Sequence, residues 1–532
     1  MNNTSNEFDL IVIGGGINGA GIARDAAERG LKVLLLEKND FGSGTSSWSS
    51  RLIHGGLRYL EYGEVPLVFE SLRERRVLQR IAPHLVRRLP LTVPVYEHSK
   101  RGMWLIRMGM IAYDLLSIGK SVPRHRMLSR QKLMEAMPGL NQVGLRGGAR
   151  YFDAQVTYAE RLVLENIVAA ERAGAVCLNY SPVIGINVSQ NQFKSLQYID
   201  RDTGNEVEAS ATLAINAAGP WVDRVLGTVN REMPDFMGGT KGSHIVVPRF
   251  AKAPKDALYA EARADGRPFF IIPWNEQFLI GTTDIRYNGE PSDVHASEEE
   301  IDYLLTETNR LFPEAHLRRD HVHYTYSGVR PLPRAEAGPE SAITRRHIIK
   351  KHRVLARGLV SIIGGKLTTY RNLAEQATDY ACKKNDRREL KCQTASRPLP
   401  GAAGIEEART RLADVPALSR EGRRRMLAVY GGFAKDIVDL ALTSDELAGT
   451  IDVQRTMLVA EVHHAIKAES AVTLIDVIHR RMMIGLDADQ GRPVAAAVAE
   501  LAGQLLGWDK AELGRQIARL QQYNDRLAAN AG

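Results

Sequence analysis

The sequence has few cysteines, and their spacing excludes several kinds of chemistry. Three of its 532 residues are cysteine, and no two of them form a CxxC pair: Cys177, Cys382 and Cys392. An odd number of widely spaced cysteines argues against a disulfide framework, thiol catalysis and a zinc site. We therefore expect a protein of a reducing compartment.

The sequence also lacks a secretory signal, a long apolar run, internal repeats and low-complexity tracts. Its first residues, MNNTSNEFDL, show no basic region followed by an apolar stretch. Residues 11–13 are apolar, but a transmembrane helix takes about 20 such residues. These absences predict a protein of the cytoplasm, or one that is peripherally associated with the cytoplasmic face of the inner membrane.

The composition is that of a soluble globular protein, with 44% hydrophobic and 25% charged residues. A chain of this length is too long for one core, which predicts two or three domains. The formal net charge of +8 favours an anionic partner, such as a phosphorylated substrate or an acidic membrane surface. Lysine and arginine side chains scattered over a solvated surface explain the same charge equally well.

The clearest pattern present is a strand, a glycine turn, a helix and a second strand at the N-terminus. Residues 8–13 are a continuous apolar run, typical of a parallel strand buried on both faces, and residues 32–37 repeat that pattern. Between them lie the turn GGGING (14–19) and a helical stretch that ends at Gly30. The unit predicts the start of a doubly wound α/β sheet.

Each part of this unit has a physical role in binding a dinucleotide. Gly14 permits the tight turn, Gly16 lets the backbone approach a pyrophosphate, and Gly19 lets the helix pack on the strand. The helix N-terminus offers N–H groups to the phosphates, and Glu37 can accept hydrogen bonds from ribose hydroxyls. A later strand ends in a second glycine turn at Gly219. Because the chain returns to the cofactor in this way, we expect FAD rather than NAD, without a covalent link.

The rest of the chain divides into an α/β region, an antiparallel region and a helical tail. The α/β region has helices at about 65–82 and 158–174 and strands at 176–178 and 211–216. Short β-rich runs from about residue 240 predict an antiparallel sheet, at 244–248, 268–273 and 277–281. Ser297 with Glu300, and Asp509 with Glu512, have the spacing of helix caps. Residues 397–404 are rich in proline and glycine and read as a linker.

Several of these motifs together resemble the FAD-dependent glycerol-3-phosphate dehydrogenases, and most of all their bacterial aerobic respiratory members. The two strongest segments are residues 13–30 and 364–374, and the resemblance extends over about 8–380. The other motifs lie between them in the family's order: SSRLIHGGLRYLE (49–61), NAAGPW (216–221), KGSHIVVPR (241–249), GTTD (281–284) and YSGVRPL (326–332).

The resemblance implies a fold of three parts. These are an FAD-binding domain of the glutathione-reductase and D-amino-acid-oxidase type, an antiparallel-sheet substrate domain and a C-terminal all-helical domain. We predict the following bounds: an oxidoreductase region at 1–395, with FAD-binding parts at about 7–90, 145–235 and 340–395 and substrate-domain parts at about 91–144 and 236–339, and a helical cap domain at 396–532.

The resemblance also implies an activity. It is the oxidation of sn-glycerol 3-phosphate to dihydroxyacetone phosphate by hydride transfer to flavin N5, with electrons passed to a membrane quinone of the ubiquinone type. We expect a homodimer that contacts inner-membrane lipid and binds no nucleic acid.

This chemistry needs cations for a phosphate, a base for the hydroxyl proton and positive charge beside the reduced flavin. The resemblance assigns catalysis to His244, Arg330 and Lys366, and substrate binding to Arg58, Tyr59, Arg330, Arg345 and Lys366. An unperturbed histidine pKa suits His244 as the base. His54 is expected beside the flavin, and a surface ion pair is the alternative for Arg345. Cofactor contacts are expected from Gly14, Gly15, Gly16, Asn18, Gly19, Glu37, Thr45, Ser46, Ser47, Gly219, Gly365, Lys366, Leu367 and Thr368.

Two further segments have more than one interpretation. His321 and His323 alternate as on a strand, but no third ligand has suitable spacing, so we predict a polar strand face and no metal. Residues 100–120 are apolar with basic ends and too short to span a bilayer. They predict either a helix in the membrane interface, anchored by Trp104 and Tyr113, or a buried helix under the cap.

Two other functions share parts of this pattern. A flavin-dependent amine or amino-acid oxidase has the same fold, but its substrate needs one cation for a carboxylate and no basic cluster. A non-catalytic FAD-binding protein would lack a substrate cluster beside the flavin. Bleaching of the flavin by glycerol 3-phosphate distinguishes all three.

Overall fold

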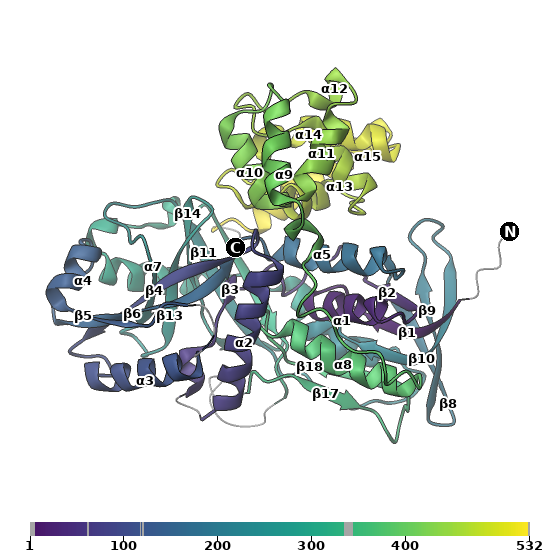
Figure 1. The fold of residues 1–532 in the computed structure, drawn as a ribbon, viewed down its shortest axis with the longest axis horizontal. Helices are drawn as coiled ribbons and strands as arrows, with labels where there is room; N and C mark the ends of the chain where they lie inside the picture. The colour runs from purple at the N-terminus through teal and green to yellow at the C-terminus, as the bar shows by residue number, and fades with distance from the viewer. Residues whose placement is uncertain (1–5, 61–62, 118, 120–121, 335–343, 530–532) are drawn as a thin grey trace.

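The computed structural model describes residues 6–60, 63–117, 119, 122–334 and 344–529. These residues form two β-sheets that lie beside each other, and a helical C-terminal domain covers one side of the junction between them (Figure 1). The predicted α/β fold class is confirmed, with its doubly wound, antiparallel and C-terminal helical parts.

The first sheet is built on the parallel unit that the N-terminal pattern predicts. β1 (Glu7–Ile13) pairs in parallel with β2 (Val33–Leu36) and β10 (Glu206–Asn216), and α1 (Ile17–Glu28) connects β1 to β2. The strand order is β17-β18-β10-β1-β2-β7, with β9 and β8 continuing from the antiparallel part of β10. The other members are β7 (Val176–Leu178), β8 (Val183–Ser189), β9 (Gln192–Ile199), β17 (Ile348–Lys351) and β18 (Leu359–Ile363).

Both faces of this sheet are covered, which explains the continuous apolar run of β1. Leu10 and Val12 pack into the core formed with the helices α1, α5 and α8, while Ile11 and Ile13 pack into a second core on the opposite face. Successive residues of β1 therefore point to opposite faces of the sheet, and both faces are buried. Because neither face meets solvent, polar residues need not alternate with apolar ones along the strand. The added helices are α5 (Ala159–Arg172), α6 (Val222–Leu226) and α8 (Tyr370–Lys384).

The second sheet is largely antiparallel, with the strand order β15-β11-β14-β13-β12-β4-β6-β3; β16 pairs with β11 and β5 with β6. Its strands are β3 (Leu52–Ile53), β4 (Val86–Tyr96), β5 (Arg126–Ser129), β6 (Leu145–Val156), β11 (Thr240–Val247), β12 (Ala257–Glu261), β13 (Pro268–Trp274), β14 (Gln277–Gly281), β15 (Ile285–Arg286) and β16 (Tyr324–Arg330). The helices around it are α2 (Val65–Ile81), α3 (Met103–Leu116), α4 (Arg130–Ala136) and α7 (Glu298–Leu311). The capping box predicted for Ser297 and Glu300 is present at the start of α7.

The strand pairing can be compared with the domain boundaries that we predicted, which stay predictions. β3 and β6 fall in ranges that we assigned to the FAD-binding parts, yet both pair within the second sheet. β6 runs antiparallel along the length of β4, and this long-range pairing leaves no signal in the local pattern of residues 145–156.

The prediction of a strand carrying His321 and His323 is wrong. Residues Arg319–His321 form one turn of 3₁₀ helix, and His323 precedes the first residue of β16. Within the described part of the chain, no group of three His, Cys, Asp or Glu residues could hold a metal ion.

The C-terminal domain is helical. Most of its buried apolar residues between about 462 and 520 form a small core of their own, whereas those at 408–441 belong to the same core as the helices of the first sheet. A turn at Pro400–Ala402, inside the predicted linker, leads into it. Its helices are α9 (Ile405–Arg411), α10 (Arg420–Tyr430), α11 (Phe433–Ala441), α12 (Asp445–Ala448), α13 (Val459–Lys467), a π-helical turn (Asp476–Arg481), α14 (Ala495–Leu506) and α15 (Lys510–Arg526). Asp509 caps α15 by accepting from the backbone N–H of Glu512, as predicted.

The 100–120 segment contains α3, which has one buried and one exposed face. Trp104 is 73% exposed, whereas Tyr113 is 2% exposed and its hydroxyl donates to Asp153. The prediction that Tyr113 anchors the segment at a membrane surface is therefore wrong, because this side chain lies in the core. Among the helices of the described residues, none is both long and apolar enough to cross a membrane.

Candidate functional site

A channel of about 830 Å³ lies where the parallel strands of the first sheet end. Its walls include the turns that follow β1, β2, β10 and β18, and these turns contribute residues from 13–18, 36–49, 217–221 and 365–367. Parallel strands bring their carboxyl ends to one edge of a sheet, and this edge is where such folds bind their ligands.

The glycine turn after β1 is shaped as the sequence predicts. Gly14 has a φ of +106°, and a Cβ there would lie 2.8 Å from the Ala217 carbonyl oxygen. A Cβ at Gly19 would lie 1.8 Å from the Gly14 oxygen, so Gly19 is needed for packing behind the channel. Gly16 lines the channel, and a Cβ there would meet only Ser46 Oγ, at 3.4 Å. A larger side chain at Gly16 would therefore extend into the channel.

Glu37, at the end of β2, holds the glycine turn in place. One carboxylate oxygen accepts from the backbone N–H of Gly15 at 2.7 Å and the other from that of Asn39 at 2.9 Å. Burial raises the pKa of Glu37, although these two hydrogen bonds act in the opposite direction and lower it. Glu37 lines the channel wall, the position that ribose recognition requires.

The loop after β2 contains three predicted cofactor contacts with hydroxyl groups, Thr45, Ser46 and Ser47, and two of them line the channel. Ser46 Oγ accepts from the N–H of Ile17 at 3.0 Å, and Thr45 Oγ1 donates to the Val329 carbonyl at 2.8 Å. Both line the channel. Ser47 is buried and does not line it, since its hydroxyl donates to the Gly42 carbonyl at 2.7 Å.

The turn after β18 forms another part of the wall. Gly365, with a φ of +100°, Lys366 and Leu367 line the channel, as does Gly219 of the turn after β10. Thr368 lies behind the wall, and its hydroxyl accepts from the backbone N–H of His54 at 3.2 Å. The helix α8 begins only at Tyr370, so Lys366 belongs to the turn before it.

Two buried polar atoms of the channel have no hydrogen-bond partner among the described residues. They are Lys366 Nζ and Asn18 Oδ1. Burial lowers the pKa of Lys366 to about 7, although Glu70 and Glu64 oppose this shift. Unpaired buried polar atoms are costly, so a bound group is expected to pair with them. A flavin dinucleotide offers both kinds of partner: its phosphate and ring carbonyl oxygens can accept from Lys366 Nζ, and its ring N–H and hydroxyl groups can donate to Asn18 Oδ1. The channel residues therefore fit that cofactor.

The predicted substrate-binding arginines meet at one carboxylate. Arg330, at the end of β16, pairs with Asp284 at 2.9 Å, and Arg345 pairs with the same carboxylate at 3.2 Å. Arg330 also donates to Thr282 Oγ1 and the Thr283 carbonyl. With 14% of its side chain exposed, Arg345 is largely buried, unlike the surface ion pair that was its alternative.

The Lys366 side chain joins this cluster to Tyr59. Its Nζ lies 4.4 Å from the Tyr59 ring centroid, and the charge of Arg345 contributes to the low pKa of Lys366. The predicted residue Arg58 lies in the 3₁₀ turn Leu57–Leu60, but its side chain is outside the described part of the structure.

His244 is placed beside the same cluster but is not an ordinary histidine. Its Nε2 shares a 2.8 Å hydrogen bond with Ser50 Oγ, and its Nδ1 has no partner among the described residues. Burial, together with the positive charges of Arg330 and Arg51, lowers its pKa to about 3. Our assumption of an unperturbed pKa is therefore wrong. Burial likewise lowers the pKa of His54 to about 4, and its ring packs edge-on against Phe270.

Sequence reasoning missed several residues of the site. Asp284 is the last residue of the GTTD motif, and that motif was its only signal. Gly242 makes room for Arg330, because a Cβ there would lie 2.2 Å from the guanidinium. The C-terminal domain also lines the channel, and no motif predicted this: Thr473, Ile475, Arg480, Gln516, Arg519, Tyr523, Arg526 and Leu527.

Comparison with protein families agrees with the channel's geometry. A family model described as FAD dependent oxidoreductase matches residues 9–371. A second model, described as the C-terminal domain of alpha-glycerophosphate oxidase, matches residues 392–513.

Individual relatives match nearly the whole chain. A glycerol-3-phosphate dehydrogenase of Synechocystis is 46% identical, covering 98% of this chain and 96% of the relative. A D-erythritol 1-phosphate dehydrogenase of Brucella abortus is 39% identical, covering 89% and 93%. The structure of a Bacillus halodurans glycerol-3-phosphate dehydrogenase complexed with FAD superposes with a TM-score of 0.82 at 28% identity, covering 99% and 96%. The chain therefore belongs to the FAD-dependent oxidoreductase family, in the group of the FAD-dependent glycerol-3-phosphate dehydrogenases, and FAD is its cofactor.

Proposed function

We propose that this protein oxidises sn-glycerol 3-phosphate to dihydroxyacetone phosphate and passes the electrons to a membrane quinone of the ubiquinone type. The observation that carries the proposal is the cluster of Arg330, Arg345 and Lys366 beside the FAD channel. FAD, bound without a covalent link, supplies the ring that accepts the hydride from C2 of the substrate.

The cluster suits a phosphate dianion. Guanidinium groups present paired donors that match phosphate oxygens, and such charge-assisted bonds are about twice as strong as neutral ones. Arg330 is already held by Asp284 and the Thr282 hydroxyl, so little side-chain entropy would be lost when it binds a ligand.

In this proposal, His244 is the base that removes the proton from the substrate hydroxyl. Its unprotonated ring can accept a proton, but the positive charge of Arg330 contributes to its low pKa. A phosphate dianion beside Arg330 would offset that charge and raise the pKa of His244. The substrate would thereby make its own base stronger. Lys366 would gain a proton for the same reason and then stabilise negative charge as it develops on the flavin ring.

The test is anaerobic mixing of the FAD-loaded enzyme with glycerol 3-phosphate while the flavin absorbance is followed. We expect rapid bleaching, and slower bleaching with glycerol, which has no phosphate. D-erythritol 1-phosphate tests the substrate of the Brucella relative, and glycine tests an amino-acid oxidase. Faster bleaching by glycine, or none by glycerol 3-phosphate, would refute the proposed substrate.

Association with the cytoplasmic face of the inner membrane is part of the same proposal, and α3 supports it. This helix exposes apolar side chains over one face, and it lies on the opposite side of the molecule from the C-terminal helices (Figure 1). Trp104 is 73% exposed and Leu115 62%. The other exposed apolar residues of α3 are Leu105, Met108 and Ile111. An uncovered apolar strip of this kind usually marks an interface.

Liposome co-sedimentation tests this contact. Trp104→Glu with Leu115→Glu should leave the membrane fraction and still bleach with substrate. The control is Val453→Glu, which charges a 93% exposed apolar residue of the C-terminal domain. Equal sedimentation of the double variant and the wild type would place the membrane contact elsewhere. Sedimentation in detergent checks the expected homodimer, and a short-chain ubiquinone should be reduced faster than oxygen.

A further inference from the structure

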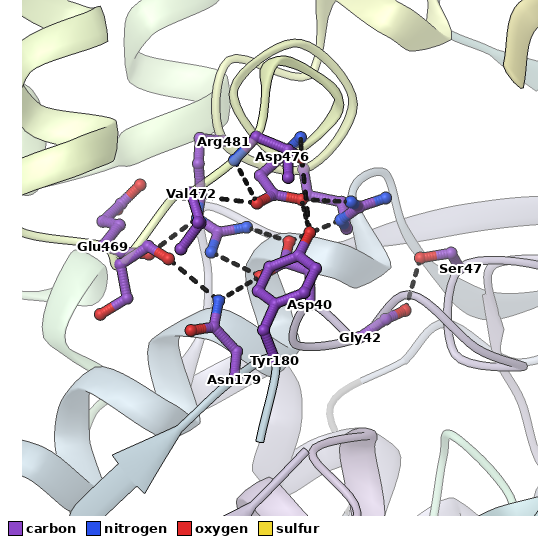
Figure 2. Close-up of polar contacts among 12 residues, drawn as sticks. Asp40, Gly42, Ser47, Asn179, Tyr180, Glu469, Val472, Asp476 and Arg481 are labelled. Atoms are coloured by element: carbon purple, nitrogen blue, oxygen red, sulfur yellow. Dashed lines mark hydrogen bonds and ion pairs between the residues drawn. The ribbon is translucent and has the colours of Figure 1, made fainter. Parts of the chain in front are cut away.

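The C-terminal domain is joined to the first sheet by a buried cluster of charges (Figure 2). Asp40, in the loop after β2, accepts from Arg481 at 2.5 and 2.8 Å and from Arg480 at 2.5 Å. Both arginines lie in the π-helical turn of the C-terminal domain. Burial alone would raise the pKa of Asp40, but these two guanidiniums hold it well below its ordinary range.

Neighbouring contacts extend this junction. Arg161 of α5 pairs with Glu469 through two hydrogen bonds of 2.7 Å. The hydroxyl of Tyr180 donates to Asp476 at 2.7 Å (Figure 2). Asp476 also pairs with Arg480. The charged side chains of these pairs are each at most 8% exposed. Separating the two domains would leave several buried charges without partners, which is costly.

The same domain reaches the FAD channel from this junction. Arg480 and Tyr523 line the channel, and so does Trp48 of the loop after β2. The ring centroids of Trp48 and Tyr523 lie 6.4 Å apart. At the end of α15, Arg526 donates to the carbonyls of Ser292 and Val294. Those two residues line the channel as well. The C-terminal domain thus contributes one wall and also fixes part of another.

We propose that the C-terminal domain is part of the FAD site, and that its docking through Asp40 and Arg161 closes the channel around the cofactor. FAD binding and domain docking then favour each other, because each is more stable when the other is complete. The α15 side chains Tyr523 and Arg526 become FAD-retaining residues. Nothing in the local sequence of α15 assigns them that role.

The test measures FAD affinity in variants of junction residues that do not themselves line the channel. Arg481 and Glu469 are absent from the described residues that line the channel. We expect Arg481→Gln and Glu469→Gln each to weaken FAD binding to the apoprotein by roughly tenfold or more, a typical coupling between sites. Binding is followed by flavin fluorescence, without substrate, so the result is independent of the proposed reaction.

Proteolysis of the 397–404 linker supplies the reciprocal measurement. FAD should slow cleavage of the wild type, and both junction variants should be cleaved faster. The matched control is Arg409→Gln, which breaks an exposed pair with Glu406 away from the junction and should behave as wild type. Variants that are cleaved faster yet bind FAD with wild-type affinity would overturn the proposal.

A milder variant decides the question if the junction variants do not fold. Arg526→Gln leaves the buried charges of the junction intact. It removes the contact with residues 292–294 and one arginine of the channel wall. We expect FAD to dissociate a few times faster from it, by the same coupling. An unchanged dissociation rate would overturn the proposal.

Discussion

The proposed substrate cluster (Arg330, Arg345, Lys366 and His244) and the junction with the C-terminal domain both bury charged side chains, but they pair them differently. At the junction, each carboxylate oxygen of Asp40 accepts from a guanidinium. In the proposed substrate cluster, Lys366 Nζ and His244 Nδ1 have no hydrogen-bond partner among the described residues, and both groups have lowered pKa values.

This difference indicates what each region is for. Charges that pair within the protein hold two domains together, and removing one partner is costly. Buried polar groups without a protein partner reduce stability, and proteins keep them where a ligand will pair with them. The junction therefore holds the two domains together, and the proposed substrate cluster is suited to binding a ligand.

The largest expected effect concerns the junction. Asp40→Asn removes the carboxylate that Arg480 and Arg481 share. Arg480 then keeps its pair with Asp476, and Arg481 keeps its hydrogen bond to the Glu469 carbonyl. We expect unfolding to become easier by about 3–5 kcal/mol. Urea denaturation of the FAD-loaded protein measures this change. A loss below about 1 kcal/mol would show that the junction is solvated and contributes as little as a surface pair.

Unlike Asp40→Asn, Lys366→Met should slow the reaction without lowering the stability of the protein. It removes a buried cation without a hydrogen-bond partner among the described residues, so the apoprotein should be at least as stable as the wild type. Flavin reduction by glycerol 3-phosphate should slow by about 100- to 1,000-fold, as for other preorganised electrostatic groups. Stopped-flow spectroscopy and thermal melting separate the two effects. If the variant apoprotein were less stable than the wild type while flavin reduction stayed at the wild-type rate, Lys366 would contribute to stability and not to the reaction, contrary to our comparison.

Arg330→Ala should weaken substrate binding or turnover by about ten- to a hundredfold, because it removes charge-assisted hydrogen bonds worth about 1.5–3 kcal/mol. FAD content should stay unchanged. If Arg330 depresses the pKa of His244, the pH profile of flavin reduction should also shift to higher pH. Arg318→Ala, which removes an exposed arginine outside the channel, serves as the control. Normal kinetics in the Arg330 variant would count against this site.

The smallest effect, counted per histidine and per pH unit, is a pH dependence of apoprotein stability. His54 and His244 have folded pKa values of about 4 and 3, below the ordinary 6.5. The unfolded chain therefore takes up more protons as pH falls from 6.5 toward 4, and stability is lost in that window. Each histidine contributes up to about 1.4 kcal/mol per pH unit. His54→Gln should flatten the slope measured by denaturation, whereas the exposed His316→Gln should not.

Much of the architecture followed from local sequence. The turn from Gly14 to Gly19 was predictable because its glycines answer local steric demands, and a Cβ at Gly19 would overlap the Gly14 carbonyl. The caps at Ser297 and Asp509 were predictable because their partners lie three residues away. The alternation from parallel to antiparallel strands was visible in the change of apolar pattern near residue 240.

Sequence could name site residues but not their environments. Ser46 and Ser47 are adjacent hydroxyls, yet the first lines the channel and the second turns away to Gly42. Tyr113 looks like an interfacial anchor until its burial against Asp153 is known. His244 has an ordinary pKa by residue type, and only its burial beside Arg330 lowers it.

The sequence by itself determined the dinucleotide unit, the helix caps and the family, because these depend on residues close along the chain. Tertiary structure alone decided the shared carboxylate of Asp284, the pKa values of Lys366 and His244, and the C-terminal wall of the channel. Desolvation and Coulomb interactions act through space, between groups that the fold brings together from distant parts of the chain. Asp40 and Arg481 are 441 positions apart, and no local pattern records that they meet.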